Sequence, residues 1–108
     1  MTPLPDAAAK FAALGDPTRL AVVNRLALGE AQSIARLTEG TLLTRQAMTK
    51  HLKVLEGVGL LRQVKVGRES RFALDPAPLA DLKAFLDLVS RQWDDALDRL
   101  RNFVETQP

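Results

Sequence analysis

The first thirty residues alternate apolar and polar positions with the period of an α-helix. This spacing predicts a short helix over residues 6–14 that ends at Gly15, and a second helix from Pro17 to about Leu28. Asp16 is a suitable N-cap for the second helix, because its carboxylate can accept backbone N–H bonds that a first helical turn leaves unpaired. The residues expected to form the buried face of the second helix are Leu20, Val23, Leu26 and Ala27.

Two further helices are predicted, with only a few residues between them. Ser33 is the expected N-cap of a short helix that reaches about Glu39, and Thr44 opens a longer one that ends at Gly57 and Gly59. Two helices joined in this way have the dimensions of a helix-turn-helix unit. The core stripe expected on the longer helix consists of Met48, Leu52 and Leu55.

From Leu60 to Leu74 the helical pattern gives way to β-forming residues, with Gly67 midway. A two-stranded hairpin with a basic tip fits this stretch, and beyond it a long helix is expected from about Pro78 to Glu105. The order of elements predicts a single domain over residues 1–108 that is mainly α with a small β-hairpin. The predicted fold class is a winged helix-turn-helix of about five helices and a two-stranded wing.

The last helix carries an apolar seam that steps by three and four residues, as in a coiled coil. It has more apolar face than so small a domain can cover, so we expect residues 6–14 and 78–105 to be dimerisation helices of a homodimer; a purely intramolecular core helix is the alternative. For Trp93, a place in the interface or core is favoured over ligand stacking. The residues expected at the dimer interface are Phe11, Leu82, Leu86, Val89, Trp93, Leu97, Leu100 and Phe103.

Composition excludes several kinds of chemistry. The 108 residues are 46% hydrophobic and 26% charged, as in a soluble globular protein. With no cysteine and one histidine, the sequence predicts no disulfide, no metal site, no cofactor and no catalytic residues. Neither a signal peptide nor an apolar stretch of membrane-spanning length is evident, so we expect a cytoplasmic protein without membrane contacts.

The net charge of +2 is unevenly spread, because residues 43–76 alone carry a net charge of +4. Duplex DNA is the expected partner of this middle third, through the polar face of the fourth helix. Arg45, Gln46 and Thr49 are placed to contact bases, and Lys50 and Lys53 to contact phosphates. A merely solvated helix face is the alternative. The full set expected to contact DNA from this helix is Thr44, Arg45, Gln46, Thr49, Lys50, His51 and Lys53.

The predicted hairpin favours the DNA interpretation, because it adds a second cationic element that can follow a phosphate backbone or enter the minor groove. The wing residues expected to contact DNA are Arg62, Lys65, Arg68 and Arg71. His51 has no second histidine or cysteine beside it, so rim packing or a phosphate contact is favoured over a metal or catalytic role.

Two segments resemble the ArsR family of bacterial repressors. The opening Phe11-Ala12-Ala13-Leu14-Gly15-Asp16-Pro17-Thr18-Arg19-Leu20 is similar to that family's entry motif. The run Thr44-Arg45-Gln46-Ala47-Met48-Thr49-Lys50-His51-Leu52-Lys53-Val54-Leu55 resembles its recognition helix. Glu56 to Leu61 and the Gly67 hairpin extend the likeness over nearly the whole chain from Ala7.

The resemblance implies a dimeric winged-helix repressor whose first and last helices form the dimer interface and which acts on operator DNA near its own gene. By position, Arg45, Gln46, Thr49, Lys50 and His51 would face the groove, and Lys65 and Arg68 would form the wing. Metal-sensing relatives place cysteines where this chain has Glu30-Ala31-Gln32, or histidines in the last helix, where it has none. The tail from Gln92 to Glu105 looks like a metal-independent, cysteine-free subgroup.

The sequence therefore predicts a sequence-specific DNA-binding transcriptional regulator, a homodimeric repressor of an inverted-repeat operator. A winged-helix module for protein contacts is the main alternative, since a fold alone does not determine function. An enzyme is the least favoured class, because general acid/base and nucleophilic groups are scarce. The sequence identifies neither the operator nor a small-molecule effector.

Overall fold

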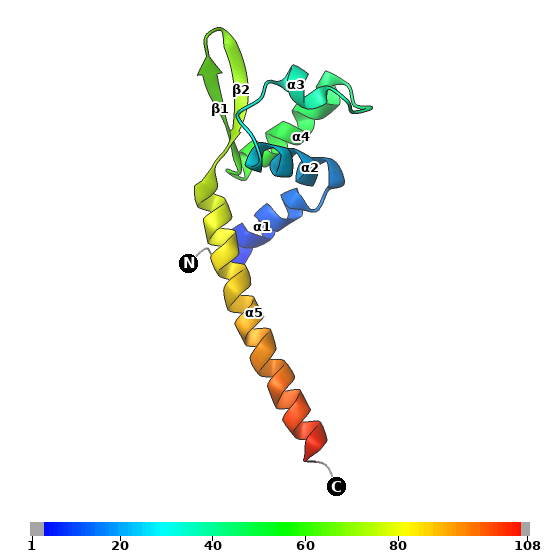
Figure 1. Cartoon of the computed structure of the whole chain (residues 1–108), viewed down its shortest axis with the longest axis vertical. Helices are drawn as coiled ribbons and strands as arrows, with labels where there is room; N and C mark the ends of the chain where they lie inside the picture. The colour runs from blue at the N-terminus through cyan, green and yellow to red at the C-terminus, as the bar shows by residue number, and fades with distance from the viewer. Residues whose placement is uncertain (1–3, 107–108) are drawn as a thin grey trace.

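The computed structural model describes residues 4–106, which form five helices and one antiparallel hairpin (Figure 1). This arrangement confirms the predicted fold class, a mainly α winged helix-turn-helix. In chain order the elements are α1 (Leu4–Leu14), α2 (Pro17–Ala27), α3 (Ile34–Thr38), α4 (Arg45–Gly57), β1 (Leu61–Val66), β2 (Glu69–Leu74) and α5 (Pro76–Glu105).

The N-caps expected for three helices are confirmed. The carboxylate of Asp16 accepts the backbone N–H of Arg19 at 3.0 Å, and Pro17 occupies the first turn of α2. The hydroxyl of Ser33 caps α3 and the hydroxyl of Thr44 caps α4, with N–H to oxygen distances of 3.2 and 3.0 Å. Each cap satisfies a donor that the helix itself leaves unpaired.

Two helix boundaries differ from the prediction. α1 begins at Leu4, before residue 6, and α5 begins at Pro76 instead of Pro78. The start of α5 repeats the chemistry of α2, because Asp75 accepts the N–H of Ala77 at 3.1 Å and a proline follows the cap directly.

The core forms around one face of α4, as the periodicity predicted. Met48, Leu52 and Leu55 are completely buried there, against Leu37 of α3 and Phe72 of β2. Side chains of this size each contribute about 1.5–3 kcal/mol when they leave water. The core thereby fixes the rotation of α4 about its own axis.

The prediction for the buried face of α2 is partly wrong. Val23 and Leu26 are buried as expected, but Leu20 and Ala27 are exposed and Val22 takes their place in the core. The run of three apolar residues from Ala21 to Val23 makes the apolar stripe broad, so the sequence alone leaves the rotation of this helix ambiguous.

The hairpin pairs Leu61 with Leu74 at its base and Val66 with Glu69 at its tip. Gly67, with φ at +63°, takes the first turn position, where a residue with a Cβ is strained. Gln32, in the loop before α3, pairs with the free edge of β2, which the sequence did not predict. Gln32 exchanges two backbone hydrogen bonds with Phe72, at 3.0 and 2.7 Å, so β2 is held from both sides.

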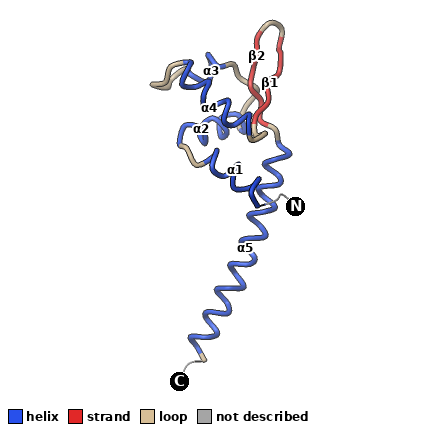
Figure 2. Tube along the Cα trace, turned by 180° about the vertical axis from the view of Figure 1, so that it is seen from behind, coloured by secondary structure: helices blue, strands red, loops and turns tan. Residues whose placement is uncertain are grey.

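α5 extends far beyond the rest of the chain, and the whole molecule, α5 included, measures 71 × 29 × 23 Å along its principal axes (Figures 1 and 2). Only its first part packs on the domain, through Leu79, Leu82 and Phe85, whereas every residue from Ser90 to Thr106 is exposed. Within residues 4–106, no helix combines the length and the apolarity needed to span a membrane.

Truncating the buried face of α4 tests this account of the core. Leu55→Ala should lower the free energy of unfolding by about 2–5 kcal/mol, because it leaves a cavity where the surrounding helices cannot collapse. Leu28→Ala, at the exposed end of α2, is the matched control and should change stability by less than about 0.5 kcal/mol. Urea unfolding followed by circular dichroism measures both; equal losses would mean that α4 does not organise the core.

Candidate nucleic-acid interface

The exposed face of α4 carries the side chains that the sequence suggested for DNA. Gln46, Lys50 and Lys53 are exposed on the side of the helix away from Met48 and the other buried residues. Arg45, three residues before Met48, is exposed at the start of the helix. Within residues 4–106, no carboxylate lies within 4.0 Å of these three cations. The structure therefore presents an unneutralised positive surface on a rigid helix.

The two threonines of this helix are already engaged. Thr44 uses its hydroxyl as the N-cap, and the Thr49 hydroxyl donates to the carbonyl oxygen of Arg45 at 2.7 Å. Thr49 consequently offers its methyl group and not a free hydroxyl, and a methyl suits contact with a thymine methyl. Arg45 and Gln46 are the residues near the helix start with free hydrogen-bonding groups.

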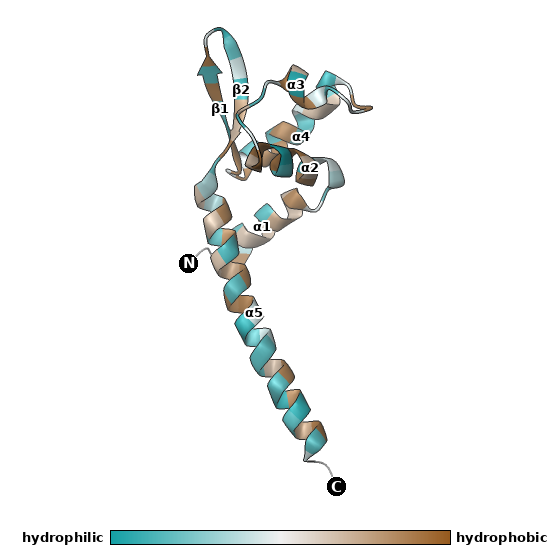
Figure 3. Ribbon diagram, viewed as in Figure 1, coloured by the Kyte–Doolittle hydropathy of each residue, from teal (hydrophilic) through white to brown (hydrophobic). Residues whose placement is uncertain are grey.

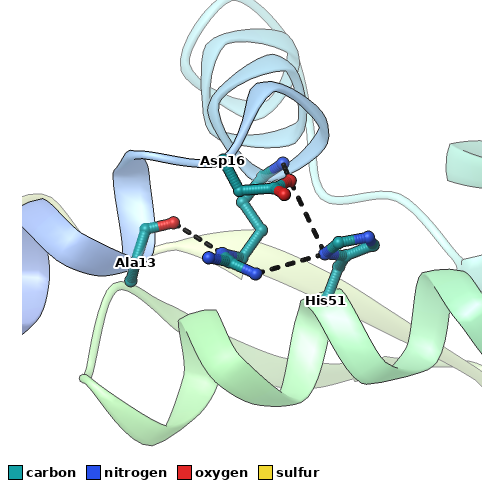
Figure 4. A network of polar contacts seen from close by, with 4 residues as sticks. Ala13, Asp16 and His51 are labelled. Atoms are coloured by element: carbon teal, nitrogen blue, oxygen red, sulfur yellow. Dashed lines mark hydrogen bonds and ion pairs between the residues drawn. The ribbon is translucent and has the colours of Figure 1, made fainter.

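For His51 the contacts within the chain fit the rim-packing alternative, and a contact with DNA stays a prediction. His51 lies two residues from both Thr49 and Lys53, and two residues turn an α-helix by about 200°, so its ring points to the opposite side. There its Nδ1 lies 3.7 Å from the carboxylate of Asp16 and 3.4 Å from the guanidinium of Arg19 (Figure 4). His51 thus connects the recognition helix to the start of α2.

Arg19 is the residue that sequence reasoning missed in this network. Its Nε donates to the carbonyl oxygen of Ala13 at the end of α1, at 2.6 Å, while its other end reaches His51 of α4 (Figure 4). One side chain therefore links the predicted dimerisation helix α1 to α4. The signal for it is the motif Asp16-Pro17-Thr18-Arg19, which indicates a helix cap and belongs to the resemblance to the family's entry motif but does not by itself place the Arg19 side chain.

The contacts around Asp16 lower the pKa of its carboxyl group. The backbone N–H of Arg19 that it accepts holds the pKa of Asp16 below its usual value; partial removal from water opposes the effect, and the charges of Arg19 and His51 add to it. The charged form of Asp16 is therefore favoured by folding.

The four cations of the wing do not act as one surface. Arg62, Lys65 and Arg68 are exposed, but Arg71 is paired with Glu69 at 2.6 Å. Strand alternation separates the others. The pairing register places Lys65 on the same face as Phe72, and Arg62 on the opposite face with Arg71. Arg62, Lys65 and Arg68 form no ion pair within residues 4–106, and Lys65 and Arg68 are the two nearest the tip.

A polar ladder fixes the wing relative to α4. The amide of Gln63 donates to the carboxylate of Glu56 at 3.3 Å, and its carbonyl oxygen accepts the hydroxyl of Ser70 at 2.9 Å. Glu56 lies in the last turn of α4, and Gln63 and Ser70 lie on β1 and β2. The hairpin and α4 are thus connected at the end of the molecule opposite the free end of α5 (Figures 1 and 2).

A second surface is the apolar stripe of α5, visible as alternating brown and teal along that helix (Figure 3). Trp93 is 68% exposed, and its neighbours along the stripe are similarly open. Two of the residues predicted at a dimer interface, Leu82 and Phe11, pack against other residues of the same chain. Leu82 is only 4% exposed, so it belongs to the core of one chain, and the Phe11 ring is 6.0 Å from that of Phe85. Of the other predicted interface residues, Val89 is half-buried, and those that are exposed are Leu86, Trp93, Leu97, Leu100 and Phe103; Val104, also exposed, extends the stripe.

The family described as a helix-turn-helix domain matches residues 14–64, which span α2 to β1. A curated relative, the HTH-type transcriptional regulator Rv2034 of Mycobacterium tuberculosis, is 35% identical over 95 residues, covering 88% of this chain and 85% of the relative. Among solved structures, an ArsR-like transcriptional regulator from Rhodococcus superposes with a TM-score of 0.80 at 34% identity, covering 95% of this chain and 96% of that one.

The chain belongs to the ArsR family of winged helix-turn-helix transcriptional regulators. This family consists of transcriptional regulators and not enzymes, as the sequence predicted. The solution structure of Mb0332 from Mycobacterium bovis is a homodimeric winged helix-turn-helix DNA-binding domain. The superposition covers 89% of this chain and 85% of Mb0332. Its TM-score is 0.62 at 21% identity, so it shares the fold with this ArsR-family regulator. Within residues 4–106, no three His, Cys, Asp or Glu side chains gather as a metal site would require.

The pKa of Asp16 generates a prediction about pH. Because folding lowers this pKa, the stabilisation that the carboxylate provides is present at neutral pH and is lost as the pH falls below about 4. Asp16→Asn should therefore be less stable than the wild type at pH 7, with the difference shrinking towards pH 3.

Urea unfolding across pH 3 to 7 measures this difference. Ser33→Ala removes the N-cap of α3, which has no titrating group, and should destabilise the protein to the same extent throughout. A constant difference for Asp16→Asn would contradict the charged cap.

Proposed function

We propose that this protein is a homodimeric, sequence-specific DNA-binding repressor that recognises an inverted-repeat operator with α4 in the major groove. The observation that carries the proposal is the uninterrupted exposed face of α4, whose cations have no acidic partner in the described chain, opposite a fully buried apolar face. A helix held in this way can enter a groove without first breaking contacts of its own.

The roles of the side chains follow from their positions on α4. Arg45 and Gln46 lie in the first turn, with free donors that match guanine and adenine edges. Lys50 and Lys53 lie further along and are suited to phosphates, which set position but not base preference. In the wing we assign phosphate or minor-groove contacts to Lys65 and Arg68, and none to Arg71, because Glu69 already neutralises it.

The apolar stripe of α5 supports a dimer. A 30-residue helix is about 45 Å long, and the residues of its second half are all exposed in the described chain, Trp93, Leu97 and Leu100 among them. Pairing with the same stripe of a second copy covers these residues. The family resemblance and the homodimeric Mycobacterium bovis neighbour support the same arrangement.

A two-fold dimer places two recognition helices on one side of the duplex. Successive major-groove faces are about 34–36 Å apart, so the proposed operator is an imperfect inverted repeat with half-sites at that spacing or a multiple of it. A dimer bound across a promoter blocks access of RNA polymerase, and repression follows from that exclusion.

Selection of bound sequences from random duplex DNA tests the proposal, with the winning sequence titrated across a salt series. We expect an inverted repeat and a steep fall of affinity with salt, because binding releases counterions from the phosphates. Enrichment of no sequence, or binding that is insensitive to salt, would favour a module for protein contacts.

Single substitutions then separate base from phosphate contacts. Arg45→Ala should cost about 1–3 kcal/mol of binding free energy and relax the preference for one base, whereas Lys65→Ala should weaken all sequences alike and lower the salt slope by about 1. Lys83→Ala removes an exposed cation of α5 and is the control, with little effect on either quantity. Equal, sequence-independent losses for Arg45→Ala and Lys65→Ala would show that Arg45 does not select bases.

The dimer is tested on α5. Leu100→Asp should weaken dimerisation by roughly a hundredfold, since each of two copies loses about 1.5 kcal/mol of apolar burial. Asn102→Asp introduces the same charge on the same turn without altering the stripe, and should leave the dimer intact. Sedimentation velocity measures the dissociation constant, and circular dichroism checks that the fold persists. Unchanged dimerisation of Leu100→Asp would exclude this stripe as the interface.

A further inference from the structure

An apolar pocket of about 430 Å³ lies beside the helix-turn-helix unit. α2 forms one wall, and the turn between α3 and α4 forms the other, with the side chain of Met48 among the lining residues. This volume is within the range of small-molecule sites, about 300–1,000 Å³. The lining residues used below are Thr18, Ala21, Arg25, Leu42, Leu43 and Met48.

The turn leaves an apolar side chain uncovered at this pocket. Leu42 is fully exposed, with 106% of its reference surface accessible. The turn has no freedom to bury it, because the Thr41 hydroxyl donates to the carbonyl of Thr38 at 2.6 Å and accepts the N–H of Leu43 at 3.3 Å. A molecule in the pocket would cover Leu42 and gain the free energy of that burial.

The charged group in the lining determines the ligand class. Arg25 is half-buried, and within residues 4–106 no carboxylate or hydrogen-bond acceptor is paired with its guanidinium. A guanidinium binds a carboxylate through two parallel hydrogen bonds, and an apolar surround strengthens them. We propose that this pocket binds a small apolar monocarboxylic acid, with its hydrocarbon part against Leu42 and Met48 and its carboxylate on Arg25.

Binding here acts on the recognition helix. Leu43 lines the pocket and directly precedes the N-cap of α4, so an occupant contacts the start of the helix. Met48, on the buried face of α4, is also among the lining residues but is only 1% exposed. A ligand that changes the position of α4 changes the affinity for DNA by its different affinity for the two positions. This regulatory step rests on the proposed function, whereas binding of the acid does not.

The chain provides its own probe of the pocket. Its two methionines are Met1 and Met48, so protein labelled with ¹³C at the methionine methyl groups gives one signal from the pocket. We expect octanoate to shift the Met48 signal saturably. Ala21→Phe, which fills the pocket, should abolish this shift, whereas Ala27→Phe, on an exposed face of α2 outside the pocket, should retain it.

The carboxylate contact is tested with a neutral ligand of the same length. Arg25→Gln should weaken octanoate binding about tenfold, as expected for loss of a charge-assisted hydrogen bond, and leave 1-octanol binding unchanged. Arg36→Gln, an exposed arginine on α3, is the matched control. Equal weakening of both ligands by Arg25→Gln would overturn the assignment of an acid.

Other occupants give distinct results. No shift of the Met48 signal, or a shift that survives Ala21→Phe, refutes the pocket. Quenching of Trp93 fluorescence over the same octanoate concentrations would place the acid on the α5 stripe instead. A Met48 signal that moves when Leu100→Asp dissociates the dimer, without octanoate, would mean that a second copy fills the pocket.

The regulatory step has its own readout. Saturating octanoate should change the dissociation constant for the selected operator at least threefold in the wild type and not in Ala21→Phe. An unchanged constant in both, with the Met48 shift intact, refutes regulation from this pocket. Absence of any specific operator with the same shift intact refutes the proposed function and leaves the ligand site standing.

Discussion

The burial of one face of α4 is the constraint on which the rest of this structure depends. Met48, Leu52 and Leu55 have no contact with water, and each would lose about 1.5–3 kcal/mol by rotating out. The opposite face carries no packing requirement, so its polar side chains are available for a ligand as large as DNA. One helix thus serves as the centre of the core and as the exposed surface, and its orientation follows from the first role.

Most of the fold followed from local rules. The caps Asp16, Ser33 and Thr44 were predictable because a short oxygen-bearing side chain before an apolar period has one good conformation. The start of α5 carries the same signal, Asp75 before Pro76, but Pro78 two residues later offers a competing first-turn proline in the sequence. The exposed face of α4 also followed from periodicity, since a helix with one buried stripe has one opposite stripe.

The errors arose where neighbours in space decide the outcome. The apolar stripe of α2 is too broad to determine how the helix is rotated about its axis. Val22 is therefore buried, whereas Leu20, expected in the core, is exposed. The contacts of His51 with Asp16 and Arg19 involve residues outside α4, so the pattern of α4 alone does not reveal them. The pairing of Arg71 with Glu69, the position of Leu82 in the core and the link from Arg19 to α1 each require contacts that no single segment encodes.

The base of the β1–β2 hairpin is held by hydrogen bonds to the loop before α3 and to α4, whereas its tip extends beyond them. This difference bears on how the length of the hairpin can vary among related proteins. Phe72 is paired on both edges and Gln63 is anchored to Glu56, whereas beyond Lys65 the described hairpin is closed by the Val66–Glu69 pair and the Gly67 turn. The length of the hairpin can therefore change without changing which residues pair at its base. Adding one residue to each strand beyond the base lengthens the hairpin while every side chain below keeps its face, so the footprint on a duplex can grow or shrink without any cost to the core.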